Sequence, residues 1–258
     1  MDNFAKAFIE AIFPVKCMGC GIFFHPAEYK RAALIDADLT VLKPFVCSKC
    51  IEGFLPVRSP MCMCCGEVFQ TSEGEDHLCE NCIKTSRAFH LARSFGTYDQ
   101  TLMTLIHRFK YGGKIQLAKP LAMLLLSAFI RFWETFRIDV IVPVPLHAKR
   151  FRKRGFNQAY LLVKDWERIV PIGITVPSVV KDVLHRNRWT APQTGLGRKE
   201  RTTNIKNPFS VTNKPVIVDK KILLVDDVYT TGATAEACTD ILLRAGARQV
   251  DVLTLARA

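Results

Sequence analysis

The segment Ile222–Thr234, which reads ILLVDDVYTTGAT, restricts the fold of this 258-residue chain more than any other part of it. Its first four residues are apolar and predict a strand that is buried on both faces. Two adjacent carboxylates, Asp226 and Asp227, follow the strand, and a loop of hydroxyl side chains with one glycine then opens into a helical pattern. A buried strand, a short loop and a helix in this order are typical of a parallel α/β sheet.

The chemistry of this segment predicts a site for a phosphorylated sugar. The first N–H groups of a helix have no intrahelical partner, and together with the hydroxyls of Thr230, Thr231 and Thr234 they suit a monophosphate. Carboxylates repel phosphate oxygens, but they accept hydrogen bonds from sugar hydroxyls and can position Mg²⁺. We therefore expect the phosphate in the loop and a ribose diol on the two aspartates.

Strand and helix patterns alternate on both sides of this segment, from about residue 88 to the C-terminus, and predict an α/β domain with a mostly parallel sheet. Open sheets of this kind bind ligands beyond the carboxyl ends of their strands, which is where the two aspartates are expected. The expected strands are Arg93–Tyr98, Ile138–Val144, Val179–His185, Lys221–Val225 and Gln249–Leu255, and the expected helices are Asp99–Lys110, Gln116–Phe132, Gly155–Arg168 and Ala233–Ala245.

Nine of the ten cysteines lie in the first 82 residues, and eight of them form four pairs with two residues between the cysteines. This spacing lets a tight turn point both sulfurs at one ion, and Gly21 and Gly66, which follow two of the pairs, permit a positive φ there. Eight sulfurs are enough for two closed tetrahedral zinc sites, which are structural because no coordination position is left for water. The predicted ligands are Cys17, Cys20, Cys47, Cys50, Cys62, Cys65, Cys79 and Cys82.

Several alternatives for the cysteines stay open at this point. A disulfide framework would compete with zinc, although a reducing compartment disfavours it. Sequential pairing, 17/20 with 47/50 and 62/65 with 79/82, is the simplest, but an interleaved order stays open. Cys64 could replace Cys62 as a ligand, but the parallel with the Cys17/Cys20 pair favours Cys62 and leaves Cys64 as a spare thiol. Cys238 lies in a helical pattern and is predicted to be a small core residue.

The thirteen residues of Ile222–Thr234 resemble the 5-phosphoribosyl-1-pyrophosphate (PRPP) signature of type I phosphoribosyltransferases. With the cysteine pairs, Lys110-Tyr111, the Val-Pro-Val-Pro strand at 142–145 and the Arg-Gly-Phe-Asn-Gln run at 154–158, nearly the whole chain is similar to the ComF family. The resemblance implies a type I phosphoribosyltransferase fold over 88–258, preceded by an N-terminal helix and double zinc ribbon over 1–87. It assigns PRPP and Mg²⁺ to Asp226, Asp227, Val228, Tyr229, Thr230, Thr231, Gly232, Ala233 and Thr234, with the two aspartates as the catalytic candidates.

Positive charge is concentrated in one part of the chain. Residues 145–206 hold 14 basic and 4 acidic side chains, a net +10 out of +12 for the whole protein, which indicates a polyanionic partner. The resemblance implies that the loop after the Val-Pro-Val-Pro strand holds pyrophosphate through Lys149, Arg150, Arg152 and Arg154, and that 186–204 is the family's mobile loop. The candidates for single-stranded DNA, where arginines are interleaved with an aromatic ring, are Arg186, Arg188, Trp189, Arg198, Lys199 and Arg201. The competing interpretation is a solvated basic surface.

The resemblance implies a role in competence, in which the protein binds PRPP and handles incoming single-stranded DNA during natural transformation. A second hypothesis is an active transferase that moves the ribosyl phosphate of PRPP to an unidentified acceptor and releases pyrophosphate. A third is a scaffold whose zinc knuckles recruit a helicase-like competence protein. The chain starts without a basic, signal-like segment, and its longest apolar run, Leu121–Ile130, is shorter than the ~20 residues of a membrane span. We expect a cytoplasmic protein without membrane insertion.

Overall fold

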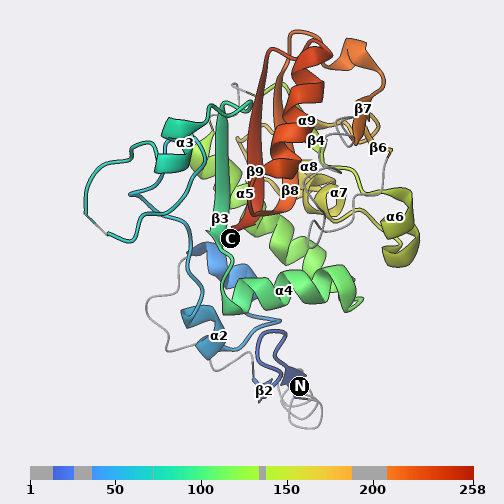
Figure 1. The fold of residues 1–258 in the computed structure, drawn as a ribbon. Helices are drawn as coiled ribbons and strands as arrows, with labels where there is room; N and C mark the ends of the chain where they lie inside the picture. Colours follow the sequence, from blue (N-terminus) through green and yellow to red (C-terminus); the bar gives the residue numbers. More distant parts are fainter. Residues whose placement is uncertain (1–13, 26–36, 72, 134–137, 188–207) are drawn as a thin grey trace, which may run out of the picture.

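The computed structural model describes residues 14–25, 37–71, 73–133, 138–187 and 208–258, and Figure 1 shows the fold. Five parallel strands form one sheet in the order β3-β9-β8-β4-β5. Their bounds are Leu91–Thr97 (β3), Gln249–Arg257 (β9), Lys221–Tyr229 (β8), Val140–Pro143 (β4) and Ser178–Val179 (β5). The α/β class and the parallel sheet predicted from the sequence are confirmed.

Helices cover both faces of the sheet. On one face, α5 packs with α7 and α8 against side chains such as Leu223 and Val225, while on the other face α9 packs against Ile222 and Leu224. Side chains of a strand alternate between faces, so the unbroken apolar run of β8 fills both layers. The helices in chain order are α4 (Gln100–Tyr111), α5 (Ala118–Phe132), α6 (Ala148–Arg154), α7 (Gln158–Val163), α8 (Trp166–Ile169) and α9 (Ala233–Arg244), with 3-10 turns at Ile115–Leu117 and Lys214–Val216.

Four predicted elements differ from the structure. The basic segment after β4, expected as a loop, forms α6, which ends at Gly155 in the left-handed conformation (φ 80°). The single helix expected at 155–168 is divided into α7, capped by the Asn157 side chain, and α8. The strand expected at 179–185 is also divided: β5 pairs with β4, whereas β6 (Leu184–Arg186) forms a separate antiparallel hairpin with β7 (Phe209–Val211). The strand expected at 221–225 is longer in the structure: β8 continues through the two aspartates to Tyr229 instead of ending at Val225.

The cysteine-rich segments form two separate centres on the surface of the α/β part (Figure 1). The first is built from β1 (Val15–Lys16), β2 (Phe23–Phe24), the 3-10 turn Ala37–Leu42 and α2 (Ser48–Glu52), and it packs on α4. The second includes α3 (Glu80–Lys84) and packs on β3 and the end of β9. Residues 1–13, where the N-terminal helix was expected, lie outside the described residues.

The apolar segment Ile115–Phe132, which contains α5, is long and apolar enough to cross a membrane by length and composition alone. A core helix of a globular protein passes the same test. In this structure Leu121, Leu124 and Phe129 are fully buried against the sheet and its neighbouring helices. The apolar character of this segment is therefore explained by the core that it fills.

Candidate functional site

The pocket of interest lies where two neighbouring strands end and their connections separate. After β4 the chain turns toward β5, and after β8 it turns through α9 toward β9, so the two connections leave the sheet in opposite directions. Such a switch point is where open α/β sheets bind ligands. The pocket is lined by Val144 beyond β4, by residues of β8 and β9, and by the loop that opens α9. Eight of the nine residues assigned to PRPP line it, namely Asp226, Val228, Tyr229, Thr230, Thr231, Gly232, Ala233 and Thr234.

The loop at the start of α9, residues 230–234, has the geometry of an anion cradle. Gly232 is the N-cap with φ 81°, and as a glycine it offers no side chain to satisfy the first N–H groups of the helix. Thr231 Oγ1 accepts a hydrogen bond from the Ala233 N–H at 3.4 Å, while the Thr230 and Thr231 side chains stay exposed. N–H groups, hydroxyls and the positive end of the helix dipole therefore face the pocket together.

The two adjacent aspartates have different surroundings. Asp226 lines the pocket, and burial together with the charge of Asp227 raises its pKa to about 7. Asp227 is buried and forms an ion pair with Lys110 of α4, with 2.7 Å between Nζ and Oδ1. Both residues belong to the regular strand β8, in which neighbouring side chains point to opposite faces. Only one of the two carboxylates therefore opens directly into the pocket.

A chain of contacts leads from Asp227 to the Arg-Gly-Phe-Asn-Gln run. Lys110 is followed by Tyr111, and the Arg154 guanidinium lies over the Tyr111 ring, 4.5 Å from its centroid. Arg154 Nη1 also donates to Gln158 Oε1 at 3.0 Å. Residues of this run thus support the site through α4. Lys110 belongs to the Lys110-Tyr111 motif of the family resemblance, but its ion pair with Asp227 was not predicted from the sequence.

The residues predicted to bind anions differ in their surroundings. Burial and the charge of Arg150 lower the pKa of Arg186, and Arg186 also feels the charge of Asp226, although neither arginine lines the pocket. Arg186 is half-buried over the Phe209 ring, which gives it a structural contact as well. Lys149 and Arg152 are exposed on α6, and Arg154 is engaged with Tyr111 and Gln158. The remaining DNA candidates, Arg188, Trp189, Arg198, Lys199 and Arg201, lie outside the described residues.

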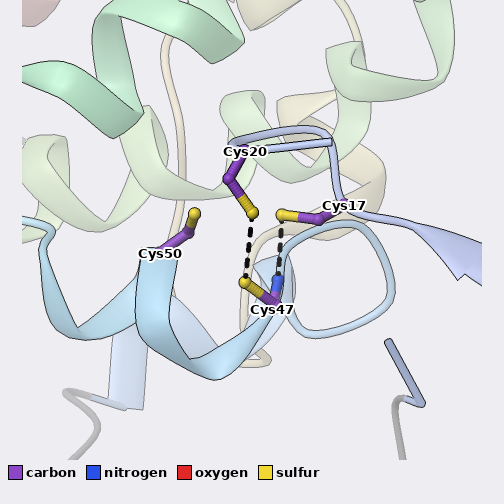
Figure 2. Close-up of side chains that lie close together, drawn as sticks. All are labelled: Cys17, Cys20, Cys47 and Cys50. Atoms are coloured by element: carbon purple, nitrogen blue, oxygen red, sulfur yellow. Dashed lines mark hydrogen bonds between the residues drawn. The ribbon is translucent and has the colours of Figure 1, made fainter. Parts of the chain in front are cut away.

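Cys17, Cys20, Cys47 and Cys50 form the first cysteine centre, shown in Figure 2. Their four sulfurs lie within 4.8 Å of one another, and the sulfurs of Cys20 and Cys47 are 3.7 Å apart. Tetrahedral zinc with Zn–S bonds of about 2.3 Å requires sulfurs about 3.8 Å apart, whereas a disulfide requires about 2.05 Å. The geometry fits a shared metal ion.

Backbone N–H groups in this centre stabilise the thiolate form of Cys17. Burial raises the pKa of the Cys17 thiol, but hydrogen bonds from the N–H groups of Cys47, Cys20 and Gly19 outweigh burial. The net effect lowers this pKa to about 6. The Gly19 and Cys47 N–H groups donate to Cys17 Sγ at 3.2 and 3.3 Å. The thiolate is the form that binds zinc, so these bonds favour the ligand state.

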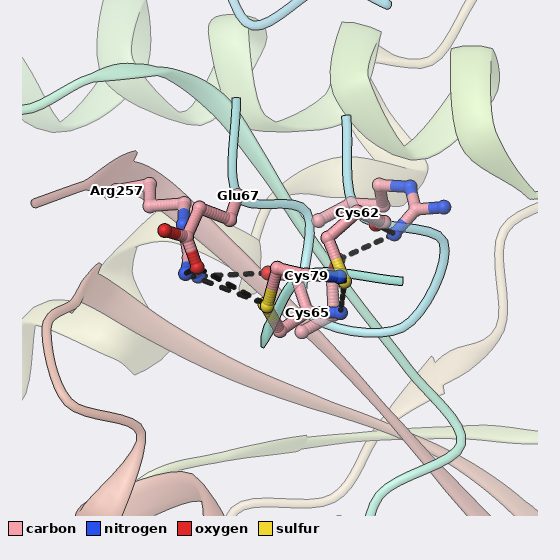
Figure 3. A network of polar contacts seen from close by, with 7 residues as sticks. Cys62, Cys65, Glu67, Cys79 and Arg257 are labelled. Carbon is pink, nitrogen blue, oxygen red and sulfur yellow. Dashed lines mark hydrogen bonds and ion pairs between the residues drawn. The ribbon is translucent and has the colours of Figure 1, made fainter. Parts of the chain in front are cut away.

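The second centre repeats the arrangement of the first with Cys62, Cys65, Cys79 and Cys82 (Figure 3). The Cys65 and Cys79 N–H groups donate to Cys62 Sγ at 3.4 and 3.3 Å, and N–H groups outweigh burial and lower the Cys62 pKa to about 6. Each tetrad is made of two cysteine pairs that follow each other in the sequence. Sequential pairing is therefore correct, and the interleaved alternative is wrong.

The other cysteine predictions also agree with the structure. All ten cysteines belong to the described residues and are free thiols, so a disulfide framework is excluded. Cys64 stays outside the second tetrad, and Cys238 is fully buried in the core beside α9. Gly21 and Gly66 have φ of 84° and 68°, as the knuckle turns require.

Comparisons with known proteins agree with this geometry. The phosphoribosyl transferase domain family matches residues 173–258. Competence protein F of Haemophilus influenzae is 34% identical over 86% of this chain and 94% of its own length, and the DNA utilization protein YhgH of Escherichia coli K12 is 31% identical over 82% and 90%. Competence protein ComFC of Streptococcus pneumoniae is 28% identical over 94% of this chain and its whole length. The purine phosphoribosyltransferase of Pyrococcus horikoshii aligns with 55% of this chain and 73% of its own at 16% identity, with a TM-score of 0.27.

The sheet, the switch-point pocket and the matched domain define a phosphoribosyltransferase-type α/β protein that carries two cysteine tetrads. Within that class the chain belongs to the ComF family, together with competence protein F, ComFC and YhgH.

Proposed function

We propose that this protein binds Mg²⁺ and PRPP in the switch-point pocket and handles single-stranded DNA in the cytoplasm during natural transformation. The observation that carries the proposal is the combination of an open helix N-terminus, hydroxyls and a carboxylate in one pocket of a ComF-family chain. The cradle at 230–234 would take the 5-phosphate. Asp226, which opens into the pocket at the end of β8, would take the ribose hydroxyls, with Asp227 beside it.

The donor set around the aspartates fits Mg²⁺, which prefers carboxylate and phosphate oxygens. Asp226 would hold the ion together with the pyrophosphate oxygens of PRPP, and the ion would neutralise part of their charge. Arg150 and Arg186, whose charges influence each other, would contact the pyrophosphate. The Lys110 ion pair fixes Asp227, so the hydroxyl-accepting edge is oriented before the ligand arrives.

Calorimetric titration with Mg²⁺-PRPP tests this binding directly. We expect one PRPP per chain for the wild-type protein and a loss of at least tenfold in affinity for Asp226→Asn. Asp240→Asn is the matched control, because Asp240 is exposed on α9 and does not line the pocket. Absence of binding to the wild-type protein, or equal effects of both substitutions, would reject the proposed pocket.

Single-stranded DNA would bind through phosphate contacts on the basic surface. Lys149, Arg152 and Lys153 are exposed on α6, with the half-exposed Phe151 ring among them. Charge for the backbone and a ring for the bases are the features that suit a single strand. The six residues predicted from the 186–204 segment would extend this surface.

Salt dependence of oligonucleotide binding tests the DNA part. Each phosphate contact contributes a slope of about 0.7 to the fall of log K with log salt. The double variant R152Q/K153Q should reduce the slope by about 1.4. The control K164Q/R168Q removes the same charge beside α8, where both side chains lie near Asp165, and should leave the slope unchanged. Salt-independent binding by the wild-type protein would reject phosphate-driven recognition.

A second function, transfer of the ribosyl phosphate to an acceptor, is favoured by the position of one acid. Burial raises the pKa of Asp226 to about 7, so this carboxyl can accept or donate a proton near neutral pH beside the pocket. Displacement of pyrophosphate by an acceptor would be measured as pyrophosphate release. Release that requires both PRPP and an acceptor would establish turnover. No release with any acceptor that binds would mean that the protein binds PRPP without transferring its ribosyl phosphate.

The metal centres and the partner complete the proposal. Each cysteine tetrad would hold one structural zinc ion, within an N-terminal module of residues 1–87 that precedes a phosphoribosyltransferase-like part of 88–258. A helicase-like competence protein would bind the N-terminal module. Capture of such a protein by the full chain, and its loss when both tetrads are disrupted, would support that partner.

A further inference from the structure

The second cysteine centre lies directly behind the phosphate cradle of residues 230–234. Cys62, Cys65 and Cys79 belong to the same buried cluster as Tyr229 and Ala235, which come just before and just after the cradle. Nothing in the zinc-binding role of the tetrad by itself requires this position. The contacts between the two sites run through two arginines.

Arg257, the last residue of β9, makes the first connection (Figure 3). Its Nη1 donates to the Cys65 carbonyl oxygen at 2.7 Å, and its Nη2 lies 3.4 Å from both Cys65 Sγ and Glu67 Oε2. The guanidinium also lies over the Tyr229 ring, 4.7 Å from its centroid. Only 12% of the Arg257 side chain is exposed, so this cation is held between a metal ligand and an aromatic ring.

Tyr229 carries the connection into the cradle. Its ring is buried, and a Cβ placed on Gly232 would lie 2.4 Å from the Tyr229 hydroxyl and 2.8 Å from its Cζ. The ring therefore touches the backbone of the N-cap residue of α9. A displacement of Tyr229 would move the turn that presents the N–H groups to a phosphate.

Arg87 makes the second connection, to the first turn of α9. The charge of Cys82 stabilises its cationic form, and its Nη1 lies 3.5 Å from Glu236 Oε1. The neighbouring Ala88 N–H donates to Glu236 Oε2 at 2.9 Å. Glu236 is thus fixed from the side of the cysteine centre, four residues beyond Gly232.

We propose that the second cysteine centre supports the phosphate site structurally. Arg257 and Arg87 are positioning residues that connect this centre to the cradle and hold the cradle in its anion-binding shape. The inference rests on the proposed binding of PRPP and adds which residues beyond the pocket set its affinity. It implies that the two cysteine centres have different roles, because the first packs on α4 and contacts it through Arg108 and Thr101.

The test compares two arginines that contact the same centre. Arg93 donates to the Met63 and Cys62 carbonyl oxygens at 3.0 and 3.3 Å, but its ring contact is Phe132, away from the cradle. Arg257→Met should weaken Mg²⁺-PRPP binding at least tenfold while two zinc ions per chain are retained. Arg93→Met should change the affinity by less than threefold. Equal affinities for the two variants would overturn the proposal.

Hydrogen exchange of the free protein separates this inference from the PRPP proposal. Amides of residues 232–236 should exchange faster in Arg257→Met than in Arg93→Met, whether or not the wild-type protein binds PRPP. Arg257→Lys, which keeps the charge but loses the planar fork, should fall between wild type and Arg257→Met. If Arg257→Met does not fold, the exchange of residues 232–236 is measured in Arg257→Lys and Glu236→Gln instead. Unchanged exchange in both of them would contradict the coupling.

Discussion

Lys110 Nζ lies 2.7 Å from Asp227 Oδ1, and the two side chains are only 16% and 11% exposed. This ion pair joins the last turn of α4 to the end of β8. The same helix receives the first cysteine centre, through Arg108, which donates to the Cys17 carbonyl oxygen, and Thr101, which donates to that of Cys50. The first centre, α4 and the acidic end of β8 therefore form one connected structure.

Loss of the Lys110 cation should destabilise the fold because Asp227 would remain buried without its charged partner. We expect Lys110→Met to lower the free energy of unfolding by about 2–4 kcal/mol at pH 7.5, measured by urea denaturation. The double variant Lys110→Met/Asp227→Asn should recover most of this loss. Lys119→Met, at an exposed lysine of α5, is the control and should change stability by less than about 0.5 kcal/mol. A cost for Lys110→Met no larger than that of the control would mean that the pair is not a structural link.

A methyl group at Gly232 should damage the cradle more than the same change at another glycine with a similar backbone. Gly232 and Gly155 have φ of 81° and 80°, so alanine costs about 1–2 kcal/mol of backbone strain at either position. Only at Gly232 would the new Cβ overlap a side chain, that of Tyr229, whereas nothing lies within 4 Å at Gly155. We expect Gly232→Ala to abolish PRPP binding and to lower the melting temperature further than Gly155→Ala does. Identical melting temperatures would show that the Tyr229 contact is absent.

The raised pKa of Asp226 predicts a pH-dependent stability. Burial and the charge of Asp227 raise this pKa from 3.8 to about 7, so between these values the native state keeps a proton that the unfolded state has lost. The contribution of Asp226 to stability is then fully present below pH 3.8 and is lost as the pH rises to 7. Urea denaturation at pH 5, 6, 7 and 8 should show wild type losing stability relative to Asp226→Asn up to pH 7 and little afterwards. A constant difference between the two proteins would contradict the assignment.

Metal content distinguishes the tetrad ligands from the neighbouring thiol. We expect two zinc ions per chain in the wild-type protein and about one in Cys65→Ser. Cys64→Ser is the matched control at the adjacent position, and it should retain two because Cys64 lies outside the tetrad. One ion in Cys64→Ser and two in Cys65→Ser would show that Cys64, not Cys65, is the ligand.

Local sequence patterns predicted those parts of the site that depend on neighbours along the chain. The Ile222–Thr234 segment contains its own strand, loop and helix start, so both its structure and its chemistry could be inferred. The cysteine spacing predicted the four pairs for the same reason, because each knuckle is a local turn, whereas the order in which the pairs share an ion stayed open. Cys238, predicted as a core residue, is fully buried.

Contacts between distant segments could not be predicted in this way. Lys110 and Asp227 meet only because α4 packs beside the end of β8, and Arg257 reaches Cys65 only because β9 ends next to the second centre. The pyrophosphate loop was expected to be irregular, but its run of lysines and arginines has good helix propensity and forms α6 between the His147 cap and Gly155. The sequence pattern also could not show that Asp226 and Asp227 face different surroundings within β8.

Hydrogen exchange with and without Mg²⁺-PRPP tests most directly where the ligand binds. Saturating ligand should slow exchange at residues 226–236, at the end of β8 and the start of α9, and leave the outer strand β3 unchanged. Slower exchange confined to other parts of the chain, or none at a concentration that saturates calorimetric binding, would contradict the assignment of this pocket.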